Sequence, residues 1–285
     1  MQTLNQLSAL RNCLSPLRAA GKIALVPTMG ALHDGHISLV RQARDRAAHV
    51  VVSIFVNPRQ FGANEDLDAY PRQLARDAAL LQAEGVAVLW APTVEEMYPA
   101  GYATNISVSG VSEGLCGAAR PGHFDGVATV VAKLFNQVQP DLALFGEKDW
   151  QQLAVIRRMA RDLDFAQPHV SAILGVETLR EADGLAMSSR NAYLTPQERA
   201  AAAALPRAMR AAIARIEGGE PAAPALAELE RAILAAGFAS LDYAELRDAD
   251  TLEPLPAASP HPARLIAAAR LGKARLIDNM PVAPI

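Results

Sequence analysis

The chain has 285 residues, of which 51% are hydrophobic, and carries a formal net charge of −3. It is long enough to bury a full core in one large domain or two modest ones. Its apolar runs fall short of the ~20 residues that a membrane span needs, and it has no basic run or tail. The two cysteines, Cys13 and Cys116, are far apart and form no metal-binding spacing. These features predict a soluble cytoplasmic protein that binds neither membranes nor nucleic acid.

Apolar and amphipathic segments alternate along the first part of the chain. An N-terminal amphipathic helix or core edge is indicated by the spacing of Leu4, Leu7, Leu14 and Leu17. Strands are then predicted over residues 22–29, 50–56, 86–90, 141–145 and 170–176. Helices are predicted between them over residues 37–48, 68–83, 126–138 and 150–163. This alternation indicates the α/β class, with residues 1–177 forming a Rossmann-like, doubly wound parallel sheet.

The composition changes near Glu177, beyond which alanine, arginine, glutamate and proline dominate. Helices are predicted over residues 196–217 and 223–236, and short strands over residues 241–247, 264–269 and 274–278. We therefore predict that residues 178–285 form a smaller α+β C-terminal domain.

The segment that follows the first predicted strand carries the strongest chemical signal. It places His33 and His36 three positions apart, with Gly35 between them, at the start of a helix. The N–H groups of a first helical turn are expected to be free to bind an anion, which the helix dipole also favours. Two imidazole donors in addition suit a polyphosphate that gains charge during a reaction. The alternatives are a pair of surface histidines or a zinc site, and the second is disfavoured because no further His/Cys cluster lies nearby.

Two further predicted strands are also followed by polar segments. In an open parallel sheet, ligands bind beyond the carboxyl ends of the strands, so these segments are expected to share one cleft. Asn57 and Gln60 follow the second strand, and their neutral amides, like that of Gln152, suit hydroxyl and carboxylate groups. Lys148 follows a later strand and suits a phosphate, while Asp149 either accepts from ribose hydroxyls or caps its helix.

The segment from Ala186 to Asn191 offers two hydroxyls and one fixed cation near the boundary of the two halves. It is interpreted either as a phosphate-binding loop or as a helix cap or turn at the domain junction. Three common motifs are absent from the sequence: the P-loop, a Gly-x-Gly-x-x-Gly after the first strand, and a Gly-x-Ser-x-Gly elbow. The chain is therefore not a P-loop protein, and a dinucleotide cofactor and a serine hydrolase are disfavoured.

Five segments resemble, in order, the motifs of the pantoate–β-alanine ligase (pantothenate synthetase) family: residues 27–36, 55–62, 120–124, 146–149 and 183–191. The His-x-Gly-His element is similar to the signature of the superfamily that makes adenylates from ATP. The chain departs from the accompanying Lys-Met-Ser-Lys-Ser loop at Ala186 and Ser189, so Arg190 and Lys148 would have to supply the charge. The resemblance covers essentially the whole chain.

The resemblance implies an ATP-dependent ligase of the coenzyme A pathway that condenses (R)-pantoate with β-alanine. Its products are pantothenate, AMP and pyrophosphate, and its intermediate is pantoyl adenylate. It also implies a homodimer, and Mg²⁺ bound through the ATP phosphates with no metal ligand from the protein.

Roles for individual residues follow from the same resemblance. The implied catalytic residues are His36, as a proton donor, together with His33 and Lys148. The implied ATP site consists of Met29, Gly30, Ala31, Leu32, His33, Asp34, Gly35, His36, Gly146, Glu147, Lys148, Asp149, Leu179, Met187, Ser188, Ser189 and Arg190. The implied substrate-binding residues are Gln60, Gln152, Asn57, Arg120 and His123.

Three other functions are weighed against the ligase. A related nucleotidyltransferase acting on a phosphate monoester would need extra cations in its acceptor pocket, where this chain has neutral amides. An aminoacyl-tRNA synthetase is disfavoured by the small second half, and a nucleotide sensor would bind ATP without turnover. Because an acyl adenylate must be shielded from water, residues 62–70, residues 187–190 and the C-terminal domain are expected to close over the active site.

Overall fold

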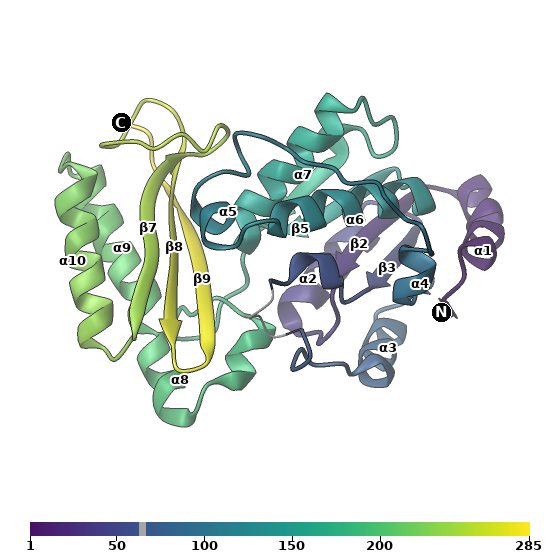
Figure 1. The fold of residues 1–285 in the computed structure, drawn as a ribbon, viewed down its shortest axis with the longest axis horizontal. Helices are drawn as coiled ribbons and strands as arrows, with labels where there is room; N and C mark the ends of the chain where they lie inside the picture. The colour runs from purple at the N-terminus through teal and green to yellow at the C-terminus, as the bar shows by residue number, and fades with distance from the viewer. Residues whose placement is uncertain (63–66) are drawn as a thin grey trace. The chain divides into compact units, whose positions relative to one another are not determined.

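A computed structural model describes residues 1–62 and 67–285 of the chain, which divide into two compact units (Figure 1). Unit 1 comprises Met1–Glu147 and Gln152–Glu177, and unit 2 comprises Lys148–Gln151 and Thr178–Ile285. The short segment Lys148–Gln151 therefore packs with the C-terminal unit, although the chain on both of its sides belongs to unit 1.

Unit 1 contains a parallel sheet in the strand order β1-β4-β3-β2-β5-β6. Its strands are β1 (Gln2–Leu4), β2 (Ile23–Thr28), β3 (His49–Ile54), β4 (Val88–Trp90), β5 (Leu142–Gly146) and β6 (Ile173–Val176). Strand order reverses where β2 pairs with β5, which makes this pair the topological switch point at which ligands of such sheets bind. The predicted Rossmann-like parallel sheet is confirmed.

Helices cover both faces of this sheet. The helices of the N-terminal part of the chain are α1 (Leu7–Ala20), α2 (Asp34–Arg44), α3 (Leu74–Ala83), α4 (Val94–Met97), α5 (Leu115–Ala119), α6 (His123–Val138) and α7 (Trp150–Asp162). Helix α2 packs on β2, β3 and β5, and Leu81 of α3 joins the same apolar cluster, whereas α6 contacts β2 and packs against α1. The first four residues of β2 are fully buried, which explains why this strand reads as a continuous apolar run.

Several predicted boundaries in unit 1 are wrong, and local features explain four of them. Leu4 belongs to the edge strand β1 rather than to the N-terminal helix. Helix α2 begins at Asp34 because His33 caps it. Helix α3 begins only at Leu74 and not at residue 68, because Pro71 disfavours helical backbone in the residue before it. Residues Val170–Ala172, predicted as strand, form a 3-10 turn ahead of β6.

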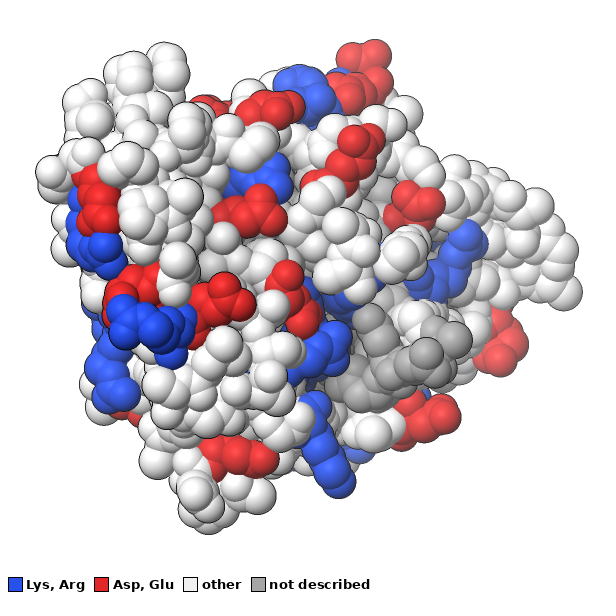
Figure 2. Space-filling view, turned by 60° about the vertical axis from the view of Figure 1, so that its left-hand side comes forward, with Lys and Arg blue, Asp and Glu red and all other residues white. Residues whose placement is uncertain are grey.

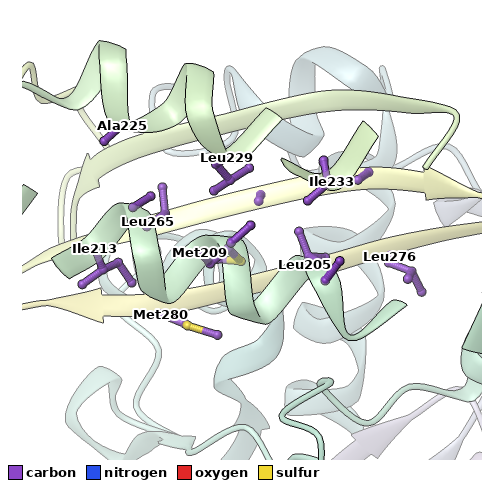
Figure 3. Packing of buried hydrophobic residues seen from close by; sticks show 14 of the residues in the cluster. Leu205, Met209, Ile213, Ala225, Leu229, Ile233, Leu265, Leu276 and Met280 are labelled. Atoms are coloured by element: carbon purple, nitrogen blue, oxygen red, sulfur yellow. The ribbon is translucent and has the colours of Figure 1, made fainter. Parts of the chain in front are cut away.

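Unit 2 is a three-stranded antiparallel sheet with helices packed on it. The strands are β7 (Ser240–Asp248), β8 (Ala263–Leu271) and β9 (Ala274–Val282), in that order across the sheet. The helices are α8 (Pro196–Ala202), α9 (Ala204–Glu217) and α10 (Ala222–Ala235). Apolar side chains of α9 and α10, such as Met209 and Leu229, pack toward Leu265 and Met280 of the sheet (Figure 3).

Two prolines explain the largest differences between prediction and structure in unit 2. The single helix predicted over residues 196–217 is two helices, because the ring of Pro206 would clash with the carbonyl of Ala202 if α8 continued. Strand β9 runs on to Val282, past the predicted end at residue 278. Pro281 is tolerated there because β9 lies at the edge of its sheet.

Acidic and basic side chains are interspersed on the face shown in Figure 2. Several arginines pair with nearby carboxylates, among them Arg41 with Glu84, Arg199 with Asp183 and Arg215 with Glu220. Exposed pairs of this kind contribute only about 0–1 kcal/mol each to stability. Within residues 1–62 and 67–285, no helix is both long and apolar enough to cross a membrane.

Candidate active site

The two histidines of the His-x-Gly-His element form a reciprocal cap at the start of α2. The backbone N–H of Gly35 donates to Nδ1 of His33 at 3.1 Å, and the N–H of His33 donates to Nδ1 of His36 at 3.3 Å. The ring centroids lie 4.1 Å apart. Because a backbone N–H can only donate, both Nδ1 atoms are acceptors, and each neutral ring carries its proton on Nε2.

This cap corrects one expectation from the sequence. The backbone amides of His33 and Gly35 are not free to bind an anion, because the two imidazoles already accept from them. The same rings carry Nε2–H groups, which are hydrogen-bond donors. The helix dipole still favours an anion at the N-terminus of α2.

The loop between β2 and α2 has an unusual backbone that is held by Asp77 of α3. Gly30 and Ala31 have positive φ angles of 82° and 52°, and this conformation is costly for alanine. The Asp77 side chain is 1% exposed, and its carboxylate oxygens accept from Ala31 N at 2.9 Å and Leu32 N at 3.0 Å. Asp77 thereby fixes the backbone that leads into the two histidines.

Asp77 is a residue that the sequence reasoning missed. Its only signal is its helical spacing from Leu81, which places it on the buried face of α3. A buried carboxylate needs hydrogen-bond partners, so an acidic residue on that face indicates a structural contact.

Asn57 and Gln60 lie together after β3, where Asn57 caps the short turn η1 (Pro58–Gln60) and Gln60 ends it. Asn57 is fully buried, and its Nδ2 donates to Gln60 Oε1 and to Gly126 O, both at 3.0 Å. Its Oδ1 accepts from the Tyr98 hydroxyl at 3.0 Å. The Asn57 amide is therefore used within the protein, where it orients the Gln60 side chain.

Arg120 and His123 contact the same turn through its backbone. Arg120 Nη2 donates to Gln60 O at 3.1 Å, and His123 Nδ1 lies 2.9 Å from that oxygen. Arg120 Nη1 lies 3.1 Å from His123 Nε2. A carbonyl only accepts and a guanidinium only donates, so His123 carries its proton on Nδ1 and accepts at Nε2.

Two further residues support this turn and were also missed. A Cβ on Gly126 would lie 2.2 Å from Arg59 O, so only glycine lets α6 approach η1 this closely. Burial is the main cause that raises the pKa of Tyr98 to about 12. Its hydroxyl therefore stays protonated near neutral pH and can donate to Asn57.

Lys148 belongs to the turn η2 (Glu147–Asp149), which follows β5. Its Nζ lies 3.4 Å from Asp149 Oδ2, and its side chain is largely buried. Trp150 begins α7 directly after this turn, and its indole N–H donates to Ala249 O at 2.9 Å. Gly146 ends β5, and among the described residues no heavy atom lies within 4 Å of a Cβ built there. Gln152 is half-buried on the first turn of α7.

The last predicted segment starts as a small hairpin. Met187 N donates to Leu179 O at 3.0 Å, and Arg180 bridges to Ala186. Ser188 Oγ accepts from Arg190 N at 3.3 Å and caps the short helix η4 (Ser189–Tyr193), so the interpretation as a cap holds for Ser188. Of the predicted closing segment 62–70, residues 63–66 lie outside the described residues.

The predicted residues thus fall into two groups. In unit 1, residues 29–36 follow β2 and the Asn57–Gln60 pair follows the neighbouring parallel strand β3. In unit 2, Lys148 and Asp149 lie in the same compact unit as Leu179 and residues 187–190.

Comparison with known proteins places this arrangement in a family. The sequence profile described as Pantoate-beta-alanine ligase matches residues 2–281. The chain is 71% identical, over the full length of both chains, to the pantothenate synthetase of Novosphingobium aromaticivorans. It is 61% identical to that of Sphingopyxis alaskensis, covering 99% of this chain and all of the relative. These matches do not favour a phosphate-monoester nucleotidyltransferase.

Solved structures give the same result. The crystal structure of the Thermus thermophilus pantothenate synthetase matches with a TM-score of 0.92 and 49% identity, covering all of both chains. The Francisella tularensis pantoate–β-alanine ligase, complexed with beta-gamma ATP and β-alanine, matches with a TM-score of 0.82 and 34% identity, covering 98% of this chain and 97% of that one. The chain therefore belongs to the pantoate–β-alanine ligase family.

Proposed function

We propose that this chain carries out its family's reaction, the ATP-dependent condensation of pantoate with β-alanine, on the residues described above. In the first step a pantoate carboxylate oxygen bonds to the α-phosphorus of ATP, and the bond from that phosphorus to the bridging oxygen breaks to release pyrophosphate. In the second step the β-alanine nitrogen bonds to the acyl carbon, AMP leaves, and the nitrogen loses a proton. The observation that carries the proposal is the pair of Nε2–H imidazoles after β2, beside the switch point of the sheet.

The phosphates are assigned to the positive and hydrogen-bond-donating groups. His33, His36 and Lys148 would bind the triphosphate and stabilise the charge that develops on pyrophosphate, with His36 as a proton donor. The nucleotide site is completed by residues 29–32, Asp34, Gly35, residues 146–149, Leu179 and residues 187–190. Transfer of this kind depends mainly on alignment, and holding the carboxylate in line with the α-phosphorus is worth roughly 7–11 kcal/mol.

Pantoate is assigned to Gln60 and Gln152. The Gln60 side chain is 8% exposed, and Asn57 donates to its Oε1. That hydrogen bond sets the orientation of the amide and makes Nε2 the donor for a substrate oxygen. Asn57, Arg120 and His123 then act on pantoate through Gln60 rather than by direct contact.

Mg²⁺ is proposed as the partner of the ATP phosphates. It prefers phosphate oxygens and water, and when bound it would neutralise phosphate charge. Within residues 1–62 and 67–285, no group of three His, Cys, Asp or Glu side chains forms a metal-binding arrangement, and an ion held by phosphates requires none.

We further propose that the protein is a cytoplasmic homodimer in which residues 187–190 and the C-terminal unit close over the adenylate. Sedimentation tests the dimer, and proteolysis with and without ATP and pantoate tests the closure.

Substitution of Gln60 tests the assignment of the pantoate site. We expect Gln60→Ala to raise the KM for pantoate by roughly 10- to 100-fold with little change in the KM for ATP, because one hydrogen bond to a charged group is lost. Gln60→Glu is the matched variant, since it keeps the oxygen that accepts from Asn57 but turns a carboxylate toward the substrate. It should raise the KM for pantoate further. Loss of ATP binding with normal pantoate saturation in Gln60→Ala would contradict the assignment.

A further inference from the structure

Strand β9 carries two adjacent polar residues, Asp278 and Asn279, to which none of the roles above has been given. Each is 2% exposed. Buried polar groups are costly unless they are hydrogen-bonded, so the partners of this pair show what the strand holds in place.

Asn279 holds the turn that contains Lys148. Its Nδ2 donates to Lys148 O at 2.9 Å, and its Oδ1 accepts from Arg264 Nη1 at 2.5 Å. The Arg264 guanidinium in turn lies 3.5 Å from the centroid of the Trp150 ring. Strands β8 and β9 therefore fix the backbone of Lys148 directly and the ring of Trp150 through one arginine.

Asp278 holds the hairpin that leads into residues 187–190. Its carboxylate accepts from Arg180 Nη1 at 2.7 Å and from Arg180 Nη2 at 2.9 Å. The same guanidinium donates to Gly184 O at 3.0 Å and to Asn279 O at 3.2 Å. A bidentate guanidinium–carboxylate pair has a defined geometry, so it fixes the hairpin strand that contains Arg180.

We propose that Asp278 and Asn279 are positioning residues for ATP. Together they hold Lys148 and the hairpin that precedes residues 187–190 in one arrangement within unit 2, which prepares two separate segments of the chain for one triphosphate. Strand β9 suits this task because it pairs with β8 along its whole length and packs against α9 and η4. A shift of about 1 Å in such groups can lower a rate by about 100-fold. This inference rests on the proposed function, in which Lys148 and residues 187–190 bind ATP.

Asn279→Asp is the sharpest test, because it keeps the shape and the acceptor for Arg264 but replaces the donor to Lys148 O with an oxygen. We expect the KM for ATP to rise about tenfold or more, the KM for pantoate to change less than about twofold, and the affinity for a non-hydrolysable ATP analogue to fall in parallel. Asn279→Ala should show the same pattern without oxygen–oxygen repulsion, which guards against a folding defect in the first variant.

Asp242→Asn is the matched control. Asp242 accepts from Arg270 Nε at 3.1 Å and from Arg275 Nε at 2.7 Å, so it holds arginines of the same sheet rather than Lys148 or the hairpin. It should lower the melting temperature and leave the KM for ATP unchanged. The inference would be overturned if both Asn279 variants had the wild-type KM for ATP. It would also be overturned if Asp242→Asn raised the KM for ATP as much as they do. Absence of pantoate-dependent pyrophosphate release in the wild type would instead refute the proposed function.

Discussion

Replacement of His36 by alanine is expected to lower the rate of pantoate-dependent pyrophosphate release by about 10²- to 10³-fold, the usual effect of removing one donor from a transition-state site. The structure shows one role of this imidazole, and the proposed function gives it a second. Its Nδ1 accepts from His33 N, and its Nε2 carries the proton that would be directed at the phosphates. Pre-steady-state measurement of pyrophosphate release, with binding of an ATP analogue measured alongside, reports the chemical step and the nucleotide affinity separately.

Two isosteric variants separate the tasks of His36. A glutamine amide reaches the position of Nε2 and keeps a donor there, but it leaves the His33 N–H without its acceptor. An asparagine oxygen reaches the position of Nδ1 and keeps the cap, but it provides no donor to the phosphates. We expect His36→Gln to be more active than His36→Asn. The opposite order, or near-normal turnover in His36→Ala, would reduce the histidine to a helix cap.

Removal of Asp77 is expected to have the second-largest effect, although this residue need not touch a substrate. Asp77→Ala would remove the acceptor of the Ala31 and Leu32 N–H groups, at a cost of about 1–3 kcal/mol for the buried Leu32 N–H and less for the part-buried Ala31 N–H. The left-handed backbone at Ala31 would then lose its support. We expect a lower free energy of unfolding, and a KM for ATP that rises by at least about tenfold because the two histidines follow this loop.

The control for Asp77 is Asp141, which bonds to the opposite end of strand β2 from the loop that Asp77 holds. Asp141 accepts from Ile23 N at 2.8 Å, at the start of β2, so Asp141→Ala also removes a backbone acceptor but leaves the histidine loop untouched. It should destabilise the protein and keep the KM for ATP. Asp77→Asn, whose single amide oxygen can serve only one of the two N–H groups, should lie between wild type and Asp77→Ala. Equal effects of Asp77→Ala and Asp141→Ala on the KM for ATP would show that Asp77 contributes stability alone.

The elements that could be predicted from the sequence are those whose signal is local. Strand β2 is a continuous apolar run, and the two histidines lie directly after it, so the fold and this part of the site were predicted together. The break between α8 and α9 was not predicted, because a long alanine-rich pattern masks the effect of one proline.

The supporting residues could not be predicted, because their partners are distant in the chain. Asp77 accepts from Ala31 N, 46 residues earlier in the chain, and Asn279 donates to Lys148 O, 131 residues earlier. Asn57 was expected to contact a substrate, because its amide follows a predicted strand and the family resemblance implies that role. Only the fold shows that it is buried and bound to Gln60 and Gly126.

The measurement that tests the central claim most directly is the release of pyrophosphate from ATP with D-pantoate, first without and then with β-alanine. AMP and pantothenate should be followed in the same samples. A burst limited to about one pyrophosphate per active site without β-alanine, which becomes steady formation of AMP and pantothenate when it is added, is the predicted result. Pyrophosphate release that does not depend on pantoate would contradict the account.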